Sequence, residues 1–168
     1  MKWFFVFTAA VAGLIAIALV VGWLLPESHV ATVVATLEGP PDEVWSTIND
    51  AAAFPEWRPG VESVEIGSRG PDGPTRWVER SGTGALPLRV EEREPPERLV
   101  LRIDSEDLPF GGTWTYELEA DGHGTRVTIT ERGEIYNPFF RFVARFFLGY
   151  EATMRDYLEG LESRMAGR

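Results

Sequence analysis

The longest uncharged stretch of the sequence lies at its N-terminal end, where residues 3–25 contain no Asp, Glu, Lys or Arg. A helix of this length, rising about 1.5 Å per residue, can cross a hydrocarbon core of roughly 30 Å. Trp3 and Trp23 lie near its two ends, where aromatic side chains settle at the headgroup level, and Pro26 ends the run. The sequence therefore predicts a transmembrane anchor and short linker over residues 1–28, and one domain over residues 29–168.

A cleaved signal peptide is the alternative interpretation of this segment. Signal peptides usually have a shorter apolar core, of about 7–15 residues, and no small-x-small pattern follows here before the first predicted strand. We therefore favour a retained, single-pass anchor. Lys2 precedes the span and no basic residue follows until Arg58, so the positive-inside rule predicts an extracytoplasmic domain. Small residues spaced four apart, such as Ala18 and Gly22, are compatible with a homodimer through this helix.

The composition excludes several classes of function. All 26 acidic residues follow the apolar run, and the net charge is −10, so a nucleic-acid partner is not expected. The chain has no Cys and only two His, His29 and His123, so neither a metal site nor a cofactor is expected. The sequence also lacks a Gly-x-Ser-x-Gly elbow, a phosphate-binding glycine loop and a His-Glu-x-x-His pair.

Alternating and β-branched runs after the anchor predict an α+β domain with one antiparallel sheet in meander order. The first strand is expected over residues 29–37, followed by two short helices over residues 42–48 and 51–57. Six further strands are expected over residues 61–66, 75–80, 86–92, 98–104, 113–119 and 125–135. Asn137 and Pro138 suit the start of a long final helix, whose apolar residues recur at helical spacing up to Met165.

This order of elements, with three short motifs, resembles the START-like superfamily, also called SRPBCC, which includes polyketide cyclase/dehydrase-like and lipid-transport proteins. The motifs are residues 30–35 with residues 41–45 (VATVVA, PDEVW), residues 54–61 (FPEWRPGV) and residues 130–138 (TERGEIYNP). The resemblance implies a helix-grip fold, in which a seven-stranded antiparallel sheet wraps around the long C-terminal helix. It also implies an apolar cavity between the sheet and this helix.

Alternation along the predicted strands indicates which side chains face that cavity. Leu86, Leu88 and Val90 form one apolar file, and the next three strands supply similar files. The expected lining of the ligand cavity is Trp57, Trp77, Leu88, Val90, Leu99, Leu101, Trp114, Tyr116, Leu118, Ile129, Glu131, Phe142, Phe146 and Tyr150.

Three of the polar residues are candidates for chemistry. Glu131 continues an inward file, where a carboxylate needs a partner, and an arginine such as Arg58 or Arg132 is expected to supply it. Glu131 is then a structural ion pair, or a bulge turns it to solvent. The functional alternatives are a polar anchor for the head group of a ligand, or an acid/base with a raised pKa in an aldol-type cyclisation. Because aromatase/cyclases of this superfamily use pocket Arg and Tyr side chains, the resemblance suggests Arg58 and Tyr116 as candidate catalytic residues beside Glu131. Arg58 is alternatively a surface residue stacked on Trp57.

The start of the final helix carries too many apolar residues for one buried stripe. Residues 139–148 include Phe142, Phe146 and three further Phe. Either neighbouring loops cover the surplus, or this end touches the lipid headgroups, with Arg141 and Arg145 on its polar side.

Three functions fit these features. The favoured one is a membrane-anchored, non-enzymatic binding or carrier domain for a hydrophobic small molecule such as a lipid, quinone or polyketide-like compound. The second is an aromatase/cyclase-like enzyme, and the third is an interaction module without a small ligand.

Overall fold

The computed structural model describes residues 2–122 and 124–167 as an N-terminal helix followed by one α+β domain. The helices are α1 (Lys2–Leu24), α2 (Pro41–Asn49), the 3-10 turn η1 (Ala51–Ala53), α3 (Phe54–Trp57), α4 (Pro138–Val143), the π-helical turn η2 (Ala144–Leu148) and α5 (Ala152–Ala166). The strands are β1 (Ser28–Glu38), β2 (Ser63–Gly70), β3 (Gly73–Ser81), β4 (Gly84–Glu94), β5 (Arg98–Ile103), β6 (Phe110–Asp121) and β7 (Gly124–Ile135).

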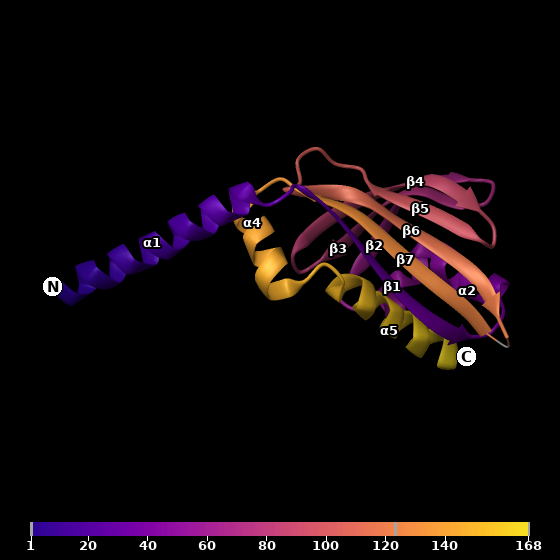
Figure 1. Ribbon diagram of the computed structural model, residues 1–168. Helices are drawn as coiled ribbons and strands as arrows, with labels where there is room; N and C mark the ends of the chain where they lie inside the picture. Colours follow the sequence, from indigo (N-terminus) through magenta and orange to yellow (C-terminus); the bar gives the residue numbers. More distant parts are fainter. Residues whose placement is uncertain (1, 123, 168) are drawn as a thin grey trace.

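The seven strands form one antiparallel sheet in the order β1-β7-β6-β5-β4-β3-β2. Strands β2 to β7 follow one another as hairpins, and β1 closes the order by pairing with β7. The helix α5 lies across one face of this sheet, and α1 projects away from the domain (Figure 1). The prediction of a helix-grip fold is therefore confirmed.

The N-terminal helix α1 has the length and apolarity needed to cross a membrane. Its 23 residues leave most side chains exposed, because α4 is the main element that contacts it. The chain leaves α1 at Leu24 and enters β1 at Ser28, so only a short linker separates the helix from the sheet.

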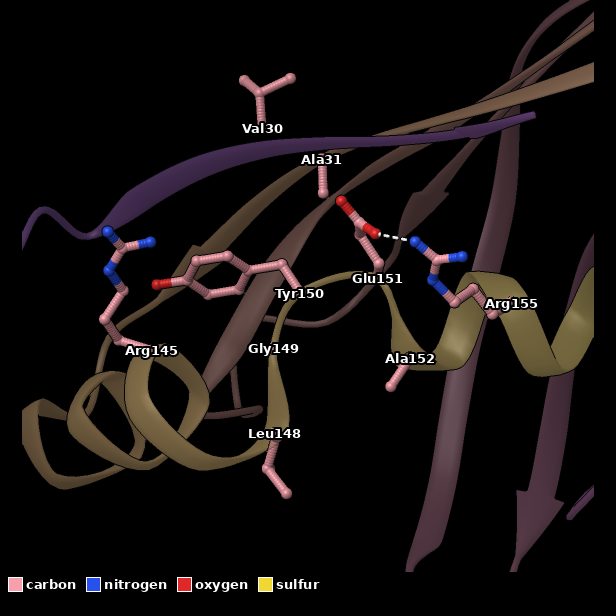
Figure 2. Close-up of a pocket in the computed structure, with 9 residues that line it drawn as sticks. All are labelled: Val30, Ala31, Arg145, Leu148, Gly149, Tyr150, Glu151, Ala152 and Arg155. Carbon is pink, nitrogen blue, oxygen red and sulfur yellow. Dashed lines mark hydrogen bonds and ion pairs between the residues drawn. The ribbon is translucent and has the colours of Figure 1, made fainter.

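The prediction of one continuous final helix is wrong in its first part. Asn137 does cap a helix, since its side chain accepts hydrogen bonds from the backbone N–H groups of Phe139 and Phe140. However, α4 and η2 end at Gly149, whose φ of 74° is a left-handed conformation that glycine adopts without strain. Figure 2 shows Gly149, Tyr150 and Glu151 crossing from the π turn to α5, which begins at Ala152.

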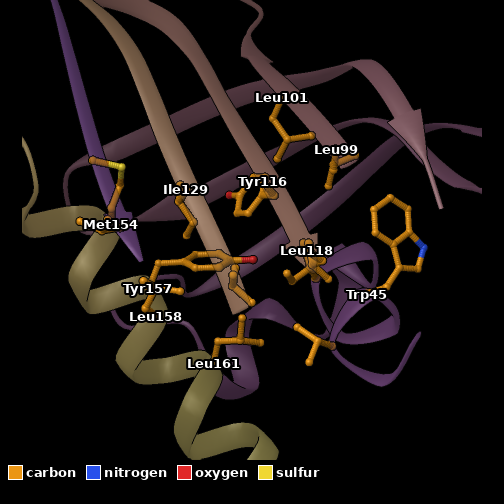
Figure 3. Close-up of a cluster of buried hydrophobic side chains, with 14 of the residues drawn as sticks. Trp45, Leu99, Leu101, Tyr116, Leu118, Ile129, Met154, Tyr157, Leu158 and Leu161 are labelled. Atoms are coloured by element: carbon orange, nitrogen blue, oxygen red, sulfur yellow. The ribbon is translucent and has the colours of Figure 1, made fainter. Parts of the chain in front are cut away.

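The core lies between the sheet and α5, with α2 closing one end. From α5, four fully or nearly fully buried residues, Met154, Tyr157, Leu158 and Leu161, face the sheet. Figure 3 shows the ring of Tyr157 extending from α5 toward Tyr116 and Ile129 on the sheet. The inward files of β4, β5, β6 and β7 all belong to this cluster or pack against it.

Candidate functional site

A buried ion pair lies at the centre of the polar groups inside the domain. Arg58, just after α3, donates a hydrogen bond from Nη1 to Oε1 of Glu79 on β3 at 2.6 Å. The indole Nε1 of Trp77, two residues earlier on the same face of β3, donates to the same oxygen at 3.1 Å. The side chains of Arg58 and Glu79 are only 17% and 5% exposed. The Arg58 side chain therefore lies in the interior, and the prediction that Arg58 is a surface residue stacked on Trp57 is wrong.

Aromatic rings surround the guanidinium of Arg58. Its Cζ atom lies 5.1 Å from the ring centroid of Phe54 and 5.0 Å from that of Tyr157, within the range of cation–π attraction. Burial is the largest single effect and lowers the pKa of Arg58, but Glu79, Tyr116 and Tyr157 together outweigh it, so the pKa rises above its ordinary value. The site thus holds a permanent positive charge that one carboxylate balances.

Two buried phenols lie beside this ion pair. Tyr116 on β6 and Tyr157 on α5 are each 2% exposed, and their ring centroids are 5.4 Å apart. Among the described residues, the Tyr157 hydroxyl makes no hydrogen bond of normal geometry, although it lies close enough to the Tyr116 hydroxyl for each to affect the pKa of the other. A buried hydroxyl without a partner destabilises a protein by about 1–3 kcal/mol. This hydroxyl, like the buried indole Nε1 of Trp57 beside it, is therefore a polar group that a bound molecule can satisfy.

Burial raises the pKa of both Tyr116 and Tyr157 well above the ordinary value, and the positive charge of Arg58 opposes this only in part. Below about pH 10 both phenols are neutral in the folded and the unfolded chain. Above it they ionise only in the unfolded chain, so the free energy of unfolding falls by about 1.4 kcal/mol per pH unit for each phenol. We expect Tyr116→Phe to reduce this slope by about 1.4 kcal/mol per pH unit in urea titrations above pH 10. An unchanged slope in both Tyr116→Phe and Tyr157→Phe contradicts the prediction.

A second cluster of polar side chains lies nearer the α1 end of the sheet, with Glu131 at its centre. On β7 it lies directly opposite Trp114, whose Nε1 donates to Oε2 at 3.0 Å. Its Oε1 lies 3.2 Å from Nε2 of His29 on β1. Gly133 makes room for this contact, because a Cβ there meets the His29 ring at 2.4 Å. The prediction that an arginine pairs with Glu131 is therefore wrong, since the register of β1 with β7 brings His29 to Glu131 instead.

A surface hollow of about 560 Å³ opens at the break between η2 and α5. Its walls include Val30 and Ala31 from β1, Arg145 and Leu148 from η2, and Tyr150 (Figure 2). The Tyr150 ring stacks on that of His29 with centroids 3.9 Å apart, and His29 in turn contacts Glu131. Tyr150 and His29 thus separate the hollow from the interior polar groups. A second, smaller hollow of about 340 Å³ lies beside Trp57 and Gly160.

Most of the residues expected to line a cavity come together in the structure, where they pack against one another as the core. Eleven of the fourteen lie in the core cluster or pack against it, and Glu131 is bonded to one of them. Phe142 and Phe146 instead lie on α4 and η2, away from that cluster, with their rings tilted against each other and their centroids 5.1 Å apart. Within the described residues, no group of His, Asp or Glu side chains has the arrangement of a metal site.

Three residues of this site were not predicted from the sequence, namely Glu79, Tyr157 and His29. Glu79 carried a signal, because an inward Trp77 places Glu79 on the same face of the strand. Tyr157 lies at the helical spacing of the apolar residues in the final helix, but no sequence pattern shows how its hydroxyl is bonded. His29 is 102 residues from Glu131 along the chain, so only the pairing of β1 with β7 reveals their contact.

Comparisons with known proteins agree with this architecture. The solved structures with similar folds include the Zhui aromatase/cyclase from a Streptomyces species, with a TM-score of 0.70 and 15% identity over 84% of this chain and 95% of that one. A START superfamily protein from Mycobacterium smegmatis has a TM-score of 0.68 and 16% identity over 83% and 98% of the two chains. A conserved protein from Geobacillus kaustophilus has a TM-score of 0.69 and 18% identity over 83% of this chain and 96% of that one.

At these identities the likeness to solved structures shows the fold alone. No curated protein matches the sequence. The family model described as polyketide cyclase / dehydrase and lipid transport matches residues 28–166, which is the whole domain after α1. The chain therefore belongs to the polyketide cyclase/dehydrase and lipid transport family.

Proposed function

We propose that this chain is a membrane-anchored binding domain for a hydrophobic small molecule, such as a lipid, a quinone or a polyketide-like compound. Residues 1–28 serve as anchor and linker, and the domain from residue 29 onward lies on the extracytoplasmic side. The molecule binds between the sheet and α5, where the inward apolar files supply the contact surface. The family match, and the structural relatives named for START and aromatase/cyclase proteins, support a ligand-binding role.

The observation that carries this proposal is that the Tyr157 hydroxyl makes no hydrogen bond of normal geometry with any described residue. This hydroxyl lies deep in an apolar core, close to the charge of Arg58 and the ring of Tyr116. A ligand carbonyl or hydroxyl placed there gives this hydroxyl a hydrogen-bond partner while the rest of the molecule stays in apolar surroundings. Specific small-molecule sites combine a mostly apolar lining with a few polar groups in this way.

The route to this site begins at the hollow beside Tyr150. Its volume of about 560 Å³ is within the range of sites for small organic molecules. The core side chains pack against one another, so a ligand must displace the Tyr150 ring from His29 to reach Tyr157. Gly149 and the π turn beside it are the natural hinge, because this part of the chain is exposed and buries no side chain in the core.

Native mass spectrometry of protein extracted gently from membranes tests this function. We expect a co-purifying apolar small molecule that is released on unfolding. Tyr157→Phe is expected to lower its affinity about fivefold, because one hydrogen bond of about 1 kcal/mol is lost. The matched control is Tyr136→Phe, since Tyr136 is exposed and its hydroxyl bonds to Glu134 outside the core. A mass without any bound molecule contradicts the proposal and favours the interaction module.

An aromatase/cyclase-like activity is the second candidate, because Arg58 and Tyr116 lie in one interior polar group. The ion pair of Arg58 with Glu79 favours the binding role over catalysis. A guanidinium that already bonds a carboxylate at 2.6 Å polarises a substrate carbonyl less than a free one does.

A further inference from the structure

The segment Pro138–Leu148, which comprises α4 and η2 and is called the aromatic segment below, exposes an unusual amount of apolar surface. Phe147 is 73% exposed, Leu148 66% and Phe146 56%, and Phe139 and Phe140 are also exposed. Of the two expectations from the sequence, the one in which neighbouring loops cover these side chains is therefore wrong. Contiguous exposed apolar patches of this kind mark an interaction surface.

The contact between α1 and α4 fixes where this surface lies. A Cβ on Gly22 meets the carbonyl oxygen of Pro138 at 1.8 Å, so the backbones of the two helices touch at this glycine. Ala18, one turn earlier in α1, is also buried. Ala18 and Gly22 are four residues apart, so the contact with α4 extends over about 6 Å of the α1 axis. Because both positions belong to the apolar run that spans the bilayer, α4 lies beside the membrane-embedded part of α1. The Ala18–Gly22 pair is consequently occupied by α4 and is not free to pack against a second copy of the helix.

Arg141 holds this arrangement in place. Its guanidinium donates to the carbonyl oxygen of Leu25 at 3.1 Å, just after α1, and to a carboxylate oxygen of Glu27 at 2.6 Å. It also donates to the carbonyl oxygens of Ile135 at 2.7 Å and Tyr136 at 3.0 Å, where β7 ends. One side chain thus ties the end of α1, the linker and the end of the sheet to α4. The aromatic segment therefore keeps a fixed depth relative to the anchor.

We propose that the aromatic segment is a membrane-docking surface that lies in the interfacial region of the same bilayer that α1 crosses. The proposal rests on the anchoring role proposed for α1. The lipid bilayer is the partner that fits, because the exposed Phe side chains continue directly from the exposed apolar end of α1 at Trp23 and Leu24. Aromatic rings favour this region of a membrane, and Arg145, which projects into the hollow, is placed to reach lipid phosphates.

This placement also sets the surroundings of the hollow. Arg145 and Leu148 belong both to the aromatic segment and to the wall of the hollow. A docked segment therefore opens the hollow at the level of the lipid headgroups, so that a hydrophobic molecule passes between bilayer and domain without crossing water.

The absence of cysteine from the sequence allows a direct test with single-cysteine variants of the full chain. Phe147→Cys, Leu14→Cys and Val34→Cys are each labelled with an environment-sensitive fluorophore in phosphatidylcholine vesicles that contain nitroxide lipids. All three positions are exposed, so the label does not disturb the core. Leu14 reports on the anchor, and Val34, on the outer side of β1, is the matched apolar control in water.

We expect quenching at Phe147→Cys to be several-fold stronger than at Val34→Cys, and the emission to shift to shorter wavelength. Strong quenching at Leu14→Cys with none at Phe147→Cys overturns the docking surface but leaves the anchor intact. Absence of quenching at both positions overturns the anchor as well as the docking surface.

Discussion

Replacing Arg141 by Ala is expected to lower the free energy of unfolding by about 3 kcal/mol or more, because buried carbonyl groups then lose a charged donor. The side chain of Arg141 is only 6% exposed. It donates to the carbonyl oxygens of Leu25, Ile135 and Tyr136, and to the carboxylate of Glu27. For a chain of this size the loss corresponds to a fall in melting temperature of roughly 10 °C. Circular dichroism of the full chain in detergent micelles measures it.

Arg145→Ala is the matched control for this experiment. Arg145 lies one turn further along the same segment and is exposed, so its removal is expected to change the free energy of unfolding by no more than about 0.5 kcal/mol. Equal effects of the two substitutions contradict the role assigned to Arg141. A smaller loss for Arg141→Ala is expected only if water replaces the guanidinium at the carbonyl groups.

The sheet could be predicted from the sequence because its physical cause is local. Each strand has one face toward α5 and one toward water, so apolar and polar side chains alternate, and short turns join neighbouring strands. The prediction of one continuous final helix was wrong in its first part. The helical spacing of apolar residues up to Met165 does correspond to a helix, α5, but this helix begins only after a break. Gly149 and the apolar residues on every side of residues 139–148 were the local signs of that break.

The site could be predicted only in part, because its contacts join residues that are distant in the sequence. Alternation placed Tyr116 and Glu131 inside the sheet, and the structure puts them there. It could not show that Glu131 contacts His29, since that depends on how β1 pairs with β7. Nor could it show that Arg58 bonds to Glu79, because Arg58 lies in a loop with no periodic pattern.

The buried pair of Arg58 and Glu79 gives the second large expected effect. Glu79→Gln keeps the shape of the side chain but leaves the Arg58 charge without a counter-ion in a mostly apolar interior. We expect the free energy of unfolding to fall by about 3 kcal/mol, the usual result of removing one partner from a buried pair. Urea unfolding measures this, and Glu65→Gln is the control, because its pair with Arg80 is exposed and its loss should be undetectable.

The double variant Arg58→Leu with Glu79→Leu identifies the cause of that loss. If the unpaired charge is what destabilises Glu79→Gln, removing both charges restores most of the stability, because neither ion then has to be desolvated. If the hydrogen bond from Trp77 to Glu79 contributes more than the charge pair, the double variant is less stable than Glu79→Gln, because Gln keeps an acceptor oxygen and Leu does not. Recovery in the double variant together with weaker retention of the co-purifying molecule shows that the pair is present for binding rather than for stability. Equal retention by the wild type and the double variant contradicts a binding role for Arg58.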